Sequence, residues 1–368
     1  MCLVLTVDLA HVAFARLTVS DEAGVWISDE RAIGFPATQL VPSWTARTPP
    51  GTWIEVALRV RTASGDLTKW YVMGRWSEHG HPRTSVPGQG DEHGDVAVDT
   101  FVARQPVTAY QVRVTRHGDG DSDGDSDGDR GDRGDGGSAR VTGLGVMASA
   151  LPRLPPAPSA PGPGGAVELA VPRRSQHAHA GHHVRYDGGG VNWCSPASVA
   201  MVLAYWGREP VPGELAWVGD GDPAPAVDHA AAGTYDESYQ GTGNWPFNVA
   251  YAGRFGLAGF VTRLRSAAEL ELFVRAGIPV ITSQSFKVHE LPGSCYSTSG
   301  HILVVTGFTT GGDIVVNDPA APRDAEVRRV YPRAAFEHVW LRSSGSGGIA
   351  YVLHPPDVPL PPCTNGNW

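Results

Sequence analysis

Cysteine is scarce in this sequence, and its four cysteines are scattered along the chain: Cys2, Cys194, Cys295 and Cys363. None of them forms a Cys-x-x-Cys pair or another spacing typical of metal ligands. This argues against a cysteine metal site and against a disulfide framework, although a single disulfide bridge stays open.

Long apolar runs and an excess of basic residues are also missing. No stretch is long enough to span a membrane, and Met1–Val19 lacks the basic opening and clean apolar run of a signal peptide. The net charge is −9, and residues 117–138, with eight Asp and two Arg, account for −6 of it. Nucleic acid and anionic membranes are therefore not expected as partners.

The length and composition favour two globular domains. The chain has 368 residues and is 41% hydrophobic, which is enough for sizeable cores. Residues 1–150 read as short strands separated by turn residues, and apolar and charged side chains alternate strictly from Ile54 to Arg61. We expect an antiparallel, jelly-roll-like β-sandwich in this region.

Two features of this front domain suggest a ligand, and each has a simpler interpretation. The Asp/Gly run at 117–138 opens like a calcium-binding loop, but Arg130 stands where a bidentate Glu is needed, so a disordered loop is favoured. Four aromatic side chains either stack on a carbohydrate or cell-surface ligand or pack in the core: Trp53, Trp70, Tyr71 and Trp76.

Proline-rich segments mark the expected domain boundaries. Residues 151–166 form a linker in which the proline density should keep the chain extended and unpacked. The second domain is expected over residues 167–354. The tail, residues 355–368, is also rich in proline, and we expect it to fray.

One cysteine lies at the expected start of a helix, in the stretch VNWCSPASVAMVLAYWG. Ser195 is a good N-cap, Pro196 suits the first turn, and Gly207 ends the helix. Cys194 would then lie at the positive end of the helix dipole, which favours a reactive thiolate. The alternative is a small buried hydrophobic residue, as most free cysteines are.

A base and an orienting acid for this thiol are expected on a hairpin. Strands at 302–308 and 313–317 flank the turn sequence TTGG. If the turn is centred in this loop, Asp318 lies opposite Leu303, whose side chain shares a face with His301. A slip of one residue would move one partner to the other face. In this register the carboxylate could orient the imidazole, and the imidazole could activate the thiol.

These motifs together resemble a known family. NWCSPASVAMVLAYWG, SGHILVVTGF and VVNDPA, in this order, are similar to the bacteriocin-processing cysteine peptidases, a papain-like group, and especially to their stand-alone secreted actinobacterial relatives. The resemblance covers Val167–Val352 and, more loosely, the front domain. It implies an α+β papain-like domain with Cys194 as nucleophile, His301 as base and Asp318 as orienting acid. It also implies a peptide or protein substrate and an extracellular or cell-surface location.

The oxyanion-stabilising residue departs from the papain-like pattern. A Gln shortly before the nucleophile normally fills this role, but Gly188 lies six residues upstream here. We expect Gln176, 18 residues upstream, to act with the backbone N–H of Cys194, with Asn192 as the substitute.

Other residues near the motifs are candidates for the substrate cleft. Trp193, next to the nucleophile, is expected to line the cleft, whereas Trp245 either lines it or anchors the core, with the core favoured. Cys295, six residues before His301, is expected to be an incidental thiol, because no helix end activates it.

A histidine-rich segment raises the question of a metal. Four histidines fall within seven residues and could supply three zinc ligands: His177, His179, His182 and His183. No acidic or thiol ligand stands at regular spacing, and the composition is that of a flexible surface loop. We therefore expect neither a metal nor a cofactor.

The sequence thus predicts a cysteine peptidase that hydrolyses peptide bonds through an acyl-enzyme. Two alternatives stay open. An inactive papain-like binding protein is favoured by the unusual spacing of the oxyanion glutamine. An amidase or transferase on peptide-like or cell-wall substrates fits because the same triad serves any acyl transfer.

Overall fold

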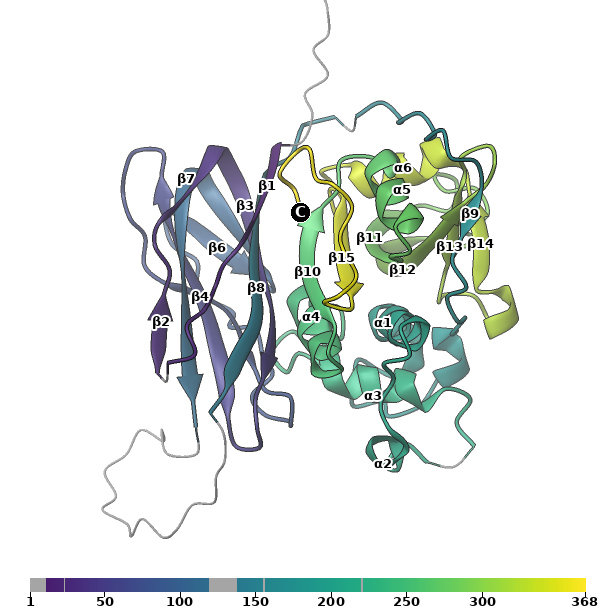
Figure 1. The fold of residues 1–368 in the computed structure, drawn as a ribbon, viewed down its shortest axis with the longest axis horizontal. Coiled ribbons are helices and arrows are strands. Elements are labelled where there is room, and N and C mark those ends of the chain that lie inside the picture. The colour runs from purple at the N-terminus through teal and green to yellow at the C-terminus, as the bar shows by residue number, and fades with distance from the viewer. Residues whose placement is uncertain (1–10, 23, 119–137, 155, 220) are drawn as a thin grey trace, which may run out of the picture.

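The computed structural model describes residues 11–22, 24–118, 138–154, 156–219 and 221–368, which form two antiparallel β-sheets, one in each half of the chain (Figure 1). The calcium-like part of the Asp/Gly run lies outside the described residues. Within the described residues, every helix is too short or too polar to cross a membrane.

The front half is built almost entirely from strands. These are β1 (His11–Arg16), β2 (Val25–Ile27), β3 (Arg31–Arg47), β4 (Trp53–Thr62), β5 (Tyr71–Trp76), β6 (Gly94–Ala97), β7 (Thr100–His117) and β8 (Arg140–Ala150). Their order is β1-β8-β3-β7-β4-β5, with β2 and β6 also paired to β7. The eight strands therefore form one continuous hydrogen-bonded sheet, and the details of the expected jelly-roll-like sandwich are not confirmed.

Strand β4 shows the predicted alternation. The four apolar side chains from Ile54 to Val60 on one face are buried, whereas Glu55 and Arg59 on the other face are partly exposed. This period of two is what a strand with one core-facing side requires.

The four front-domain aromatic residues divide between core and surface. Tyr71 and Trp76 are buried, which removes them from any sugar-stacking surface. Trp53 and Trp70 are half-buried. Trp53 stacks on His117 at 3.7 Å between ring centroids, and Trp70 lies against two guanidinium groups at 4.6 and 5.0 Å. The core interpretation therefore holds for two of the four.

The second half contains the remaining sheet. Its strands are β9 (Val167–Glu168), β10 (Ala258–Arg263), β11 (Val280–Phe286), β12 (Thr298–Phe308), β13 (Ile314–Asn317), β14 (Arg328–Tyr331) and β15 (Ile349–His354). They run in the order β10-β15-β11-β12-β13-β14, and β9 pairs with β12.

Helices cover both faces of this second sheet. They are α1 (Cys194–Tyr205), α2 (Pro212–Leu215), α3 (Pro225–Thr234), α4 (Trp245–Arg254), α5 (Ala267–Arg275) and α6 (Arg333–Leu341), with short 3-10 helices η1 (Gln176–His179), η2 (Gly190–Asn192) and η3 (Asp324–Glu326). Neighbouring residues of β15 belong to different cores: Tyr351 packs with α1, α3 and α4, and Val352 packs with α5 and α6.

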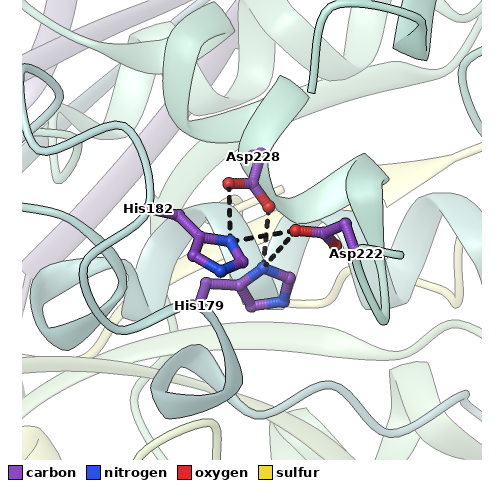
Figure 2. A group of neighbouring side chains, drawn as sticks. All are labelled: His179, His182, Asp222 and Asp228. Carbon is purple, nitrogen blue, oxygen red and sulfur yellow. Dashed lines mark ion pairs between the residues drawn. The ribbon is translucent and has the colours of Figure 1, made fainter. Parts of the chain in front are cut away.

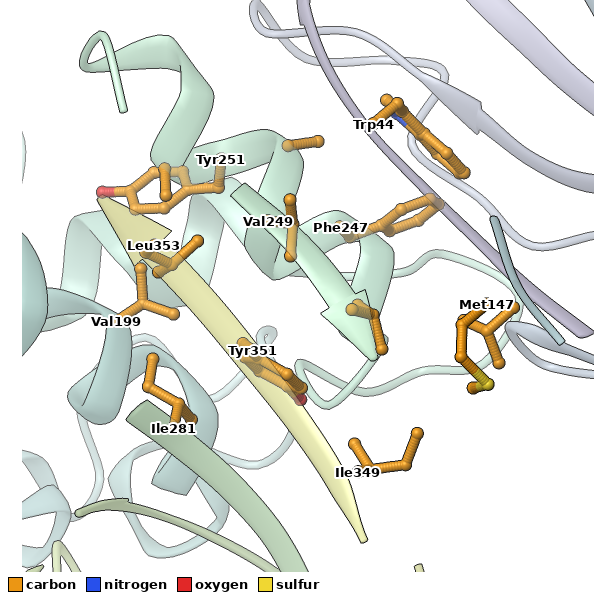
Figure 3. Close-up of a cluster of buried hydrophobic side chains, with 14 of the residues drawn as sticks. Trp44, Met147, Val199, Phe247, Val249, Tyr251, Ile281, Ile349, Tyr351 and Leu353 are labelled. Atoms are coloured by element: carbon orange, nitrogen blue, oxygen red, sulfur yellow. The ribbon is translucent and has the colours of Figure 1, made fainter. Parts of the chain in front are cut away.

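The two halves share a hydrophobic core. Phe247 of α4 contacts Trp44 of β3 and Trp76 of β5, with ring centroids 6.1 and 5.4 Å apart. Figure 3 shows Phe247 and Trp44 facing each other between the two halves. In addition, the N–H of Val261 donates to Ser43 Oγ at 3.0 Å. The front sheet is therefore fixed against the second half.

The tail is packed, contrary to expectation, whereas most of the described linker is exposed and without regular secondary structure, as predicted, and is held at two points. The N–H groups of Ser159 and Gly162 donate to Glu337 and Glu271 at 2.8 and 2.9 Å. In the tail, Trp368 is only 8% exposed and packs against α5. The prediction of a frayed tail is therefore wrong, because composition cannot show that α5 offers the tail a packing surface. In the linker, carboxylates of α5 and α6 accept two backbone N–H groups of an otherwise extended segment.

Candidate active site

Cys194 is the first residue of α1. The N-cap is Trp193, so the prediction that Ser195 caps the helix is wrong: Ser195 is buried inside the first turn. No side chain hydrogen-bonds to this helix end within the described part of the chain. The helix ends at Tyr205 with Trp206 as its C-cap, and Gly207 follows with a φ of 61°, which agrees with the prediction that this glycine stops the helix. The thiol thus lies where first-turn N–H groups point outward.

His301 and Asp318 meet through the pairing of β12 with β13. Val304 pairs with Asn317, which is the predicted register at this end of the hairpin. A bulge nearer the turn shifts the remaining pairs by one residue. His301 Nε2 and Asp318 Oδ1 consequently lie 2.9 Å apart, and both side chains are buried.

Asp318 is surrounded by hydrogen-bond donors. The hydroxyls of Tyr296 and Tyr331 donate to Oδ2 at 2.9 and 2.5 Å, and the N–H of Ala320 donates to Oδ1 at 3.0 Å. Burial raises the pKa of the Asp318 carboxyl, but the charge and hydrogen bond of His301 and the two tyrosine hydroxyls outweigh burial and hold the pKa below its ordinary value. The carboxylate therefore stays charged inside the protein.

His301 is held as a cation. Burial lowers the pKa of His301, but Asp318 and the hydrogen-bonded Cys194 side chain outweigh it and raise the pKa above its ordinary value of 6.5. Because Nε2 faces Asp318, Nδ1 is the ring nitrogen left for the sulfur. The structure therefore brings the side chains of Cys194, His301 and Asp318 together in one place.

Cys194 and His301 lie where two hollows meet. One, of about 390 Å³, is formed by the second half and includes Gln176. The other, of about 680 Å³, lies between the two halves and includes Asp99, in the turn between β6 and β7, and Trp245 of α4. The front domain therefore forms one wall of the space around the thiol.

Gln176 and Asn192 both line the first hollow beside Cys194. Gln176 is 4% exposed, and its Nε2 donates to the Val191 carbonyl at 2.5 Å. An amide nitrogen carries a second hydrogen. The 3-10 helices η1 and η2 approach closely at Gly190, where a Cβ would lie 2.4 Å from the Gln176 carbonyl oxygen. A glycine at this position thus lets the inserted segment fold back and carry Gln176 to the cleft.

The prediction for Trp193 is wrong, whereas Trp245 both packs against the core and borders a hollow. Trp193 is 0% exposed and its Nε1 donates to the Tyr186 carbonyl at 2.7 Å, so it anchors the core instead of lining the cleft. Trp245 is half-buried and lines the second hollow. Sequence position beside the nucleophile does not fix the direction of a side chain. Cys295 is exposed in a loop that borders the first hollow.

The histidine-rich segment is not the flexible surface loop that composition indicates. His179 is 1% exposed, and it lies with His182 near two carboxylates, Asp222 and Asp228 (Figure 2). These acids belong to the chain just before and within α3. Their distance along the sequence explains why no regular ligand spacing is visible. The contacts of Tyr296 and Tyr331 with Asp318 were also not predicted from the sequence, because these residues are separated from Asp318 along the chain. Of the two, only Tyr296 could have been suspected, since it lies close to His301 in the sequence.

Two family models match the chain. Residues 7–127 match the Peptidase C39 N-terminal domain, and residues 168–347 match the Peptidase_C39 like family. The protein belongs to the C39-like peptidase family and combines this N-terminal domain with the peptidase-like domain.

Solved structures show weaker likenesses. The crystal structure described as a C39-like peptidase from Bacillus anthracis is 19% identical, covers 51% of this chain and 96% of its own, and has a TM-score of 0.33. The structure of infectious bursal disease virus Gt strain is 12% identical over 38% of this chain, with a TM-score of 0.21, and the match spans 31% of the viral chain. No curated protein matches this chain.

Proposed function

We propose that the protein is a papain-like cysteine peptidase in which Cys194 attacks the carbonyl carbon of a peptide bond. The observation that carries the proposal is the chain of contacts from a thiol at a helix N-terminus, through His301, to the buried carboxylate of Asp318 at 2.9 Å. A thiol with an incidental role needs neither a cationic imidazole nor a buried charge behind it.

The first half of the reaction forms an acyl-enzyme. The Cys194 thiolate attacks the carbonyl carbon, and the electron pair of the carbonyl bond moves to oxygen. The N–H of Cys194 and the free hydrogen of Gln176 Nε2 stabilise this oxyanion. As the tetrahedral intermediate collapses, the C–N bond breaks and the imidazolium of His301 gives its proton to the leaving amine.

The second half releases the acid product. Neutral His301 takes a proton from water, and the resulting hydroxide attacks the thioester carbon. Collapse of the second intermediate expels the Cys194 thiolate, and His301 is a cation again. Asp318 keeps its charge throughout and holds the ring orientation through Nε2.

The hollows on the two sides of Cys194 suit an extended chain. A peptide could occupy the second-half hollow on one side of the scissile bond and the space against the front domain on the other. The front domain would then take part in substrate selection through the surface near Asp99. Peptide-like cell-wall amides would fit the same chemistry.

A peptide-library digestion tests the proposal. The wild-type protein and Cys363→Ala, which changes a cysteine in the tail, should cleave the same peptides, and Cys194→Ala should cleave none. Peptides bound without cleavage by the wild type would favour an inactive binding protein. Aminolysis outpacing hydrolysis when an amine is added would favour a transferase. Cleavage by Cys194→Ala at the wild-type rate would overturn the proposal.

A further inference from the structure

A second cluster of reactive side chains lies outside the triad. The His-Asp cluster consists of His179 in η1, His182 shortly after it, Asp222 before α3 and Asp228 within α3. One ligand atom from each of the four lies within 4.8 Å of all the others. Figure 2 shows the two imidazoles and the two carboxylates pointing toward a common centre.

Four nitrogen–oxygen separations within this cluster are short. His179 Nδ1 lies 2.7 Å from Asp228 Oδ2 and 3.6 Å from Asp222 Oδ2, and His182 Nδ1 lies 2.9 Å from Asp222 Oδ2 and 3.4 Å from Asp228 Oδ1. A tetrahedral zinc ion with bonds of about 2.0–2.1 Å separates its ligand atoms by about 3.3 Å. The four nitrogen–oxygen separations, which involve both oxygens of Asp228, range from 2.7 to 3.6 Å and bracket that value.

The buried atoms of the cluster are not accounted for by hydrogen bonds. His179 Nδ1, Asp222 Oδ2 and both Asp228 oxygens are buried without a hydrogen-bond partner in the described part of the chain, although an imidazole and a carboxylate approach to 2.7 Å. Their separation permits a hydrogen bond, but their orientation does not. Asp228 is 0% exposed, so its charge must be balanced from within.

We propose that the His-Asp cluster binds a divalent transition-metal cation, with zinc as the preferred ion. Two imidazole nitrogens and two carboxylate oxygens are a tetrahedral donor set of the kind zinc accepts, and two carboxylates balance its charge. All four protein ligands surround the ion, which is typical of a structural site. The cation would balance the negative charge of Asp228, whose two carboxylate oxygens are buried without hydrogen-bond partners in the described residues.

The cation would fasten the segment that carries Gln176 to the helical layer. His179 is the last residue of η1, and Gln176, on the edge of the cleft, is the first. The imidazole of His179 also lies near the Trp193 ring, with centroids 6.3 Å apart. Asp228 belongs to α3, which packs against α1. Metal binding would therefore hold the inserted segment between Gln176 and Cys194 in its folded position.

Metal titration of the full-length protein tests this proposal. After treatment with a chelator and dialysis, zinc should bind at about one equivalent per chain by calorimetry and elemental analysis, and should raise the thermal midpoint. Cobalt(II) should give the intense visible absorption of a tetrahedral site. Carrying out these measurements on Cys194→Ala keeps them independent of the proposed peptidase activity.

Two variants and one control make the test specific. His182→Ala and Asp222→Asn should each lower zinc affinity by at least about 100-fold. His182 is 37% exposed, so its truncation leaves little of a cavity in the fold. His289→Ala, which removes an exposed histidine elsewhere, should bind zinc like the parent protein. The proposal is overturned if the parent protein neither binds zinc nor gains thermal stability, or if both ligand variants bind zinc as tightly as the control.

Discussion

The Tyr331 hydroxyl donates a 2.5 Å hydrogen bond to Asp318 Oδ2, the carboxylate oxygen that His301 does not contact. Tyr296 donates to the same oxygen at 2.9 Å. The two sides of the carboxylate are thus divided: one oxygen orients the imidazole, and tyrosine donors hold the other. This division keeps Asp318 charged while it is 0% exposed.

Tyr331→Phe should therefore weaken catalysis without abolishing it. Hydrogen bonds to charged groups contribute about 1.5–3 kcal/mol, but Tyr296 still donates, so we expect kcat/KM to fall by roughly 10-fold. Steady-state kinetics on a peptide found in the library digestion measures the change. Tyr110→Phe, in a buried site of the front sheet, is the matched control. Equal kcat/KM values for Tyr331→Phe and wild type would remove Tyr331 from this role.

Asp318→Asn should shift the pH dependence of activity. Burial lowers the pKa of His301, but the nearby charge of Asp318 raises it by more. The wild-type imidazolium therefore persists above pH 6.5 and is lost as the pH rises through the raised pKa of His301. Without the carboxylate, burial dominates and the alkaline limb of kcat/KM should move to lower pH. We also expect kcat to fall roughly 10²–10⁴-fold.

The position of the alkaline limb of kcat/KM in Asp318→Asn tests whether Asp318 sets the charge of His301. A pH profile of kcat/KM for both proteins, on the same peptide, gives it directly. Loss of rate with an unmoved alkaline limb would mean that Asp318 has a structural role and does not set the charge of His301.

Gln176→Ala should mainly lower kcat, because an oxyanion donor acts in the transition state more than in substrate binding. Removal of one such donor typically costs roughly 10²–10³-fold. Asn192, the rival, is exposed, whereas Gln176 is 4% exposed and its side chain is fixed by the hydrogen bond to Val191, so Asn192→Ala should have the smaller effect. Kinetics of the two variants decide between them. A larger loss of kcat in Asn192→Ala would reverse the assignment.

Phe247→Ala should destabilise both halves of the protein together. Phe247 is 0% exposed and lies between Trp44 and Trp76, and truncation of a buried Phe costs about 3–5 kcal/mol. Differential scanning calorimetry should show one transition in the wild type and one, at lower temperature, in the variant. Leu272→Ala, at an exposed position of α5, is the control. Two separate wild-type transitions would contradict a shared core.

The parts of the site that depend on local patterns could be predicted from the sequence. The helix after Cys194 follows from Pro196 in its first turn and Gly207 after its end, and the register between Val304 and Asn317 follows from the strand period and the short turn. In both cases neighbouring residues in the chain determine the geometry. The front-sheet alternation in β4 is of the same kind.

The remaining features depend on contacts between distant segments. Tyr331 reaches Asp318 because β14 pairs with β13, and no local pattern encodes that pairing. Asp228 comes beside His179 because α3 packs near η1. Trp368 packs against Phe273 of α5, so its position depends on a helix far away in the sequence. Composition predicted neither the packing of the tail nor the two anchor points of the linker, because it cannot show which surfaces and acceptors another element supplies.

The reactivity of Cys194 toward iodoacetamide at about pH 6 tests the central claim most directly. An ordinary cysteine is almost entirely a thiol at that pH. A thiolate held by His301 should therefore be alkylated at least about 10-fold faster than the exposed Cys295 or the partly buried Cys363, with rates measured by mass spectrometry of each peptide. His301→Ala should remove this advantage. Alkylation of Cys194 no faster than that of Cys295 and Cys363 would contradict the proposed nucleophile.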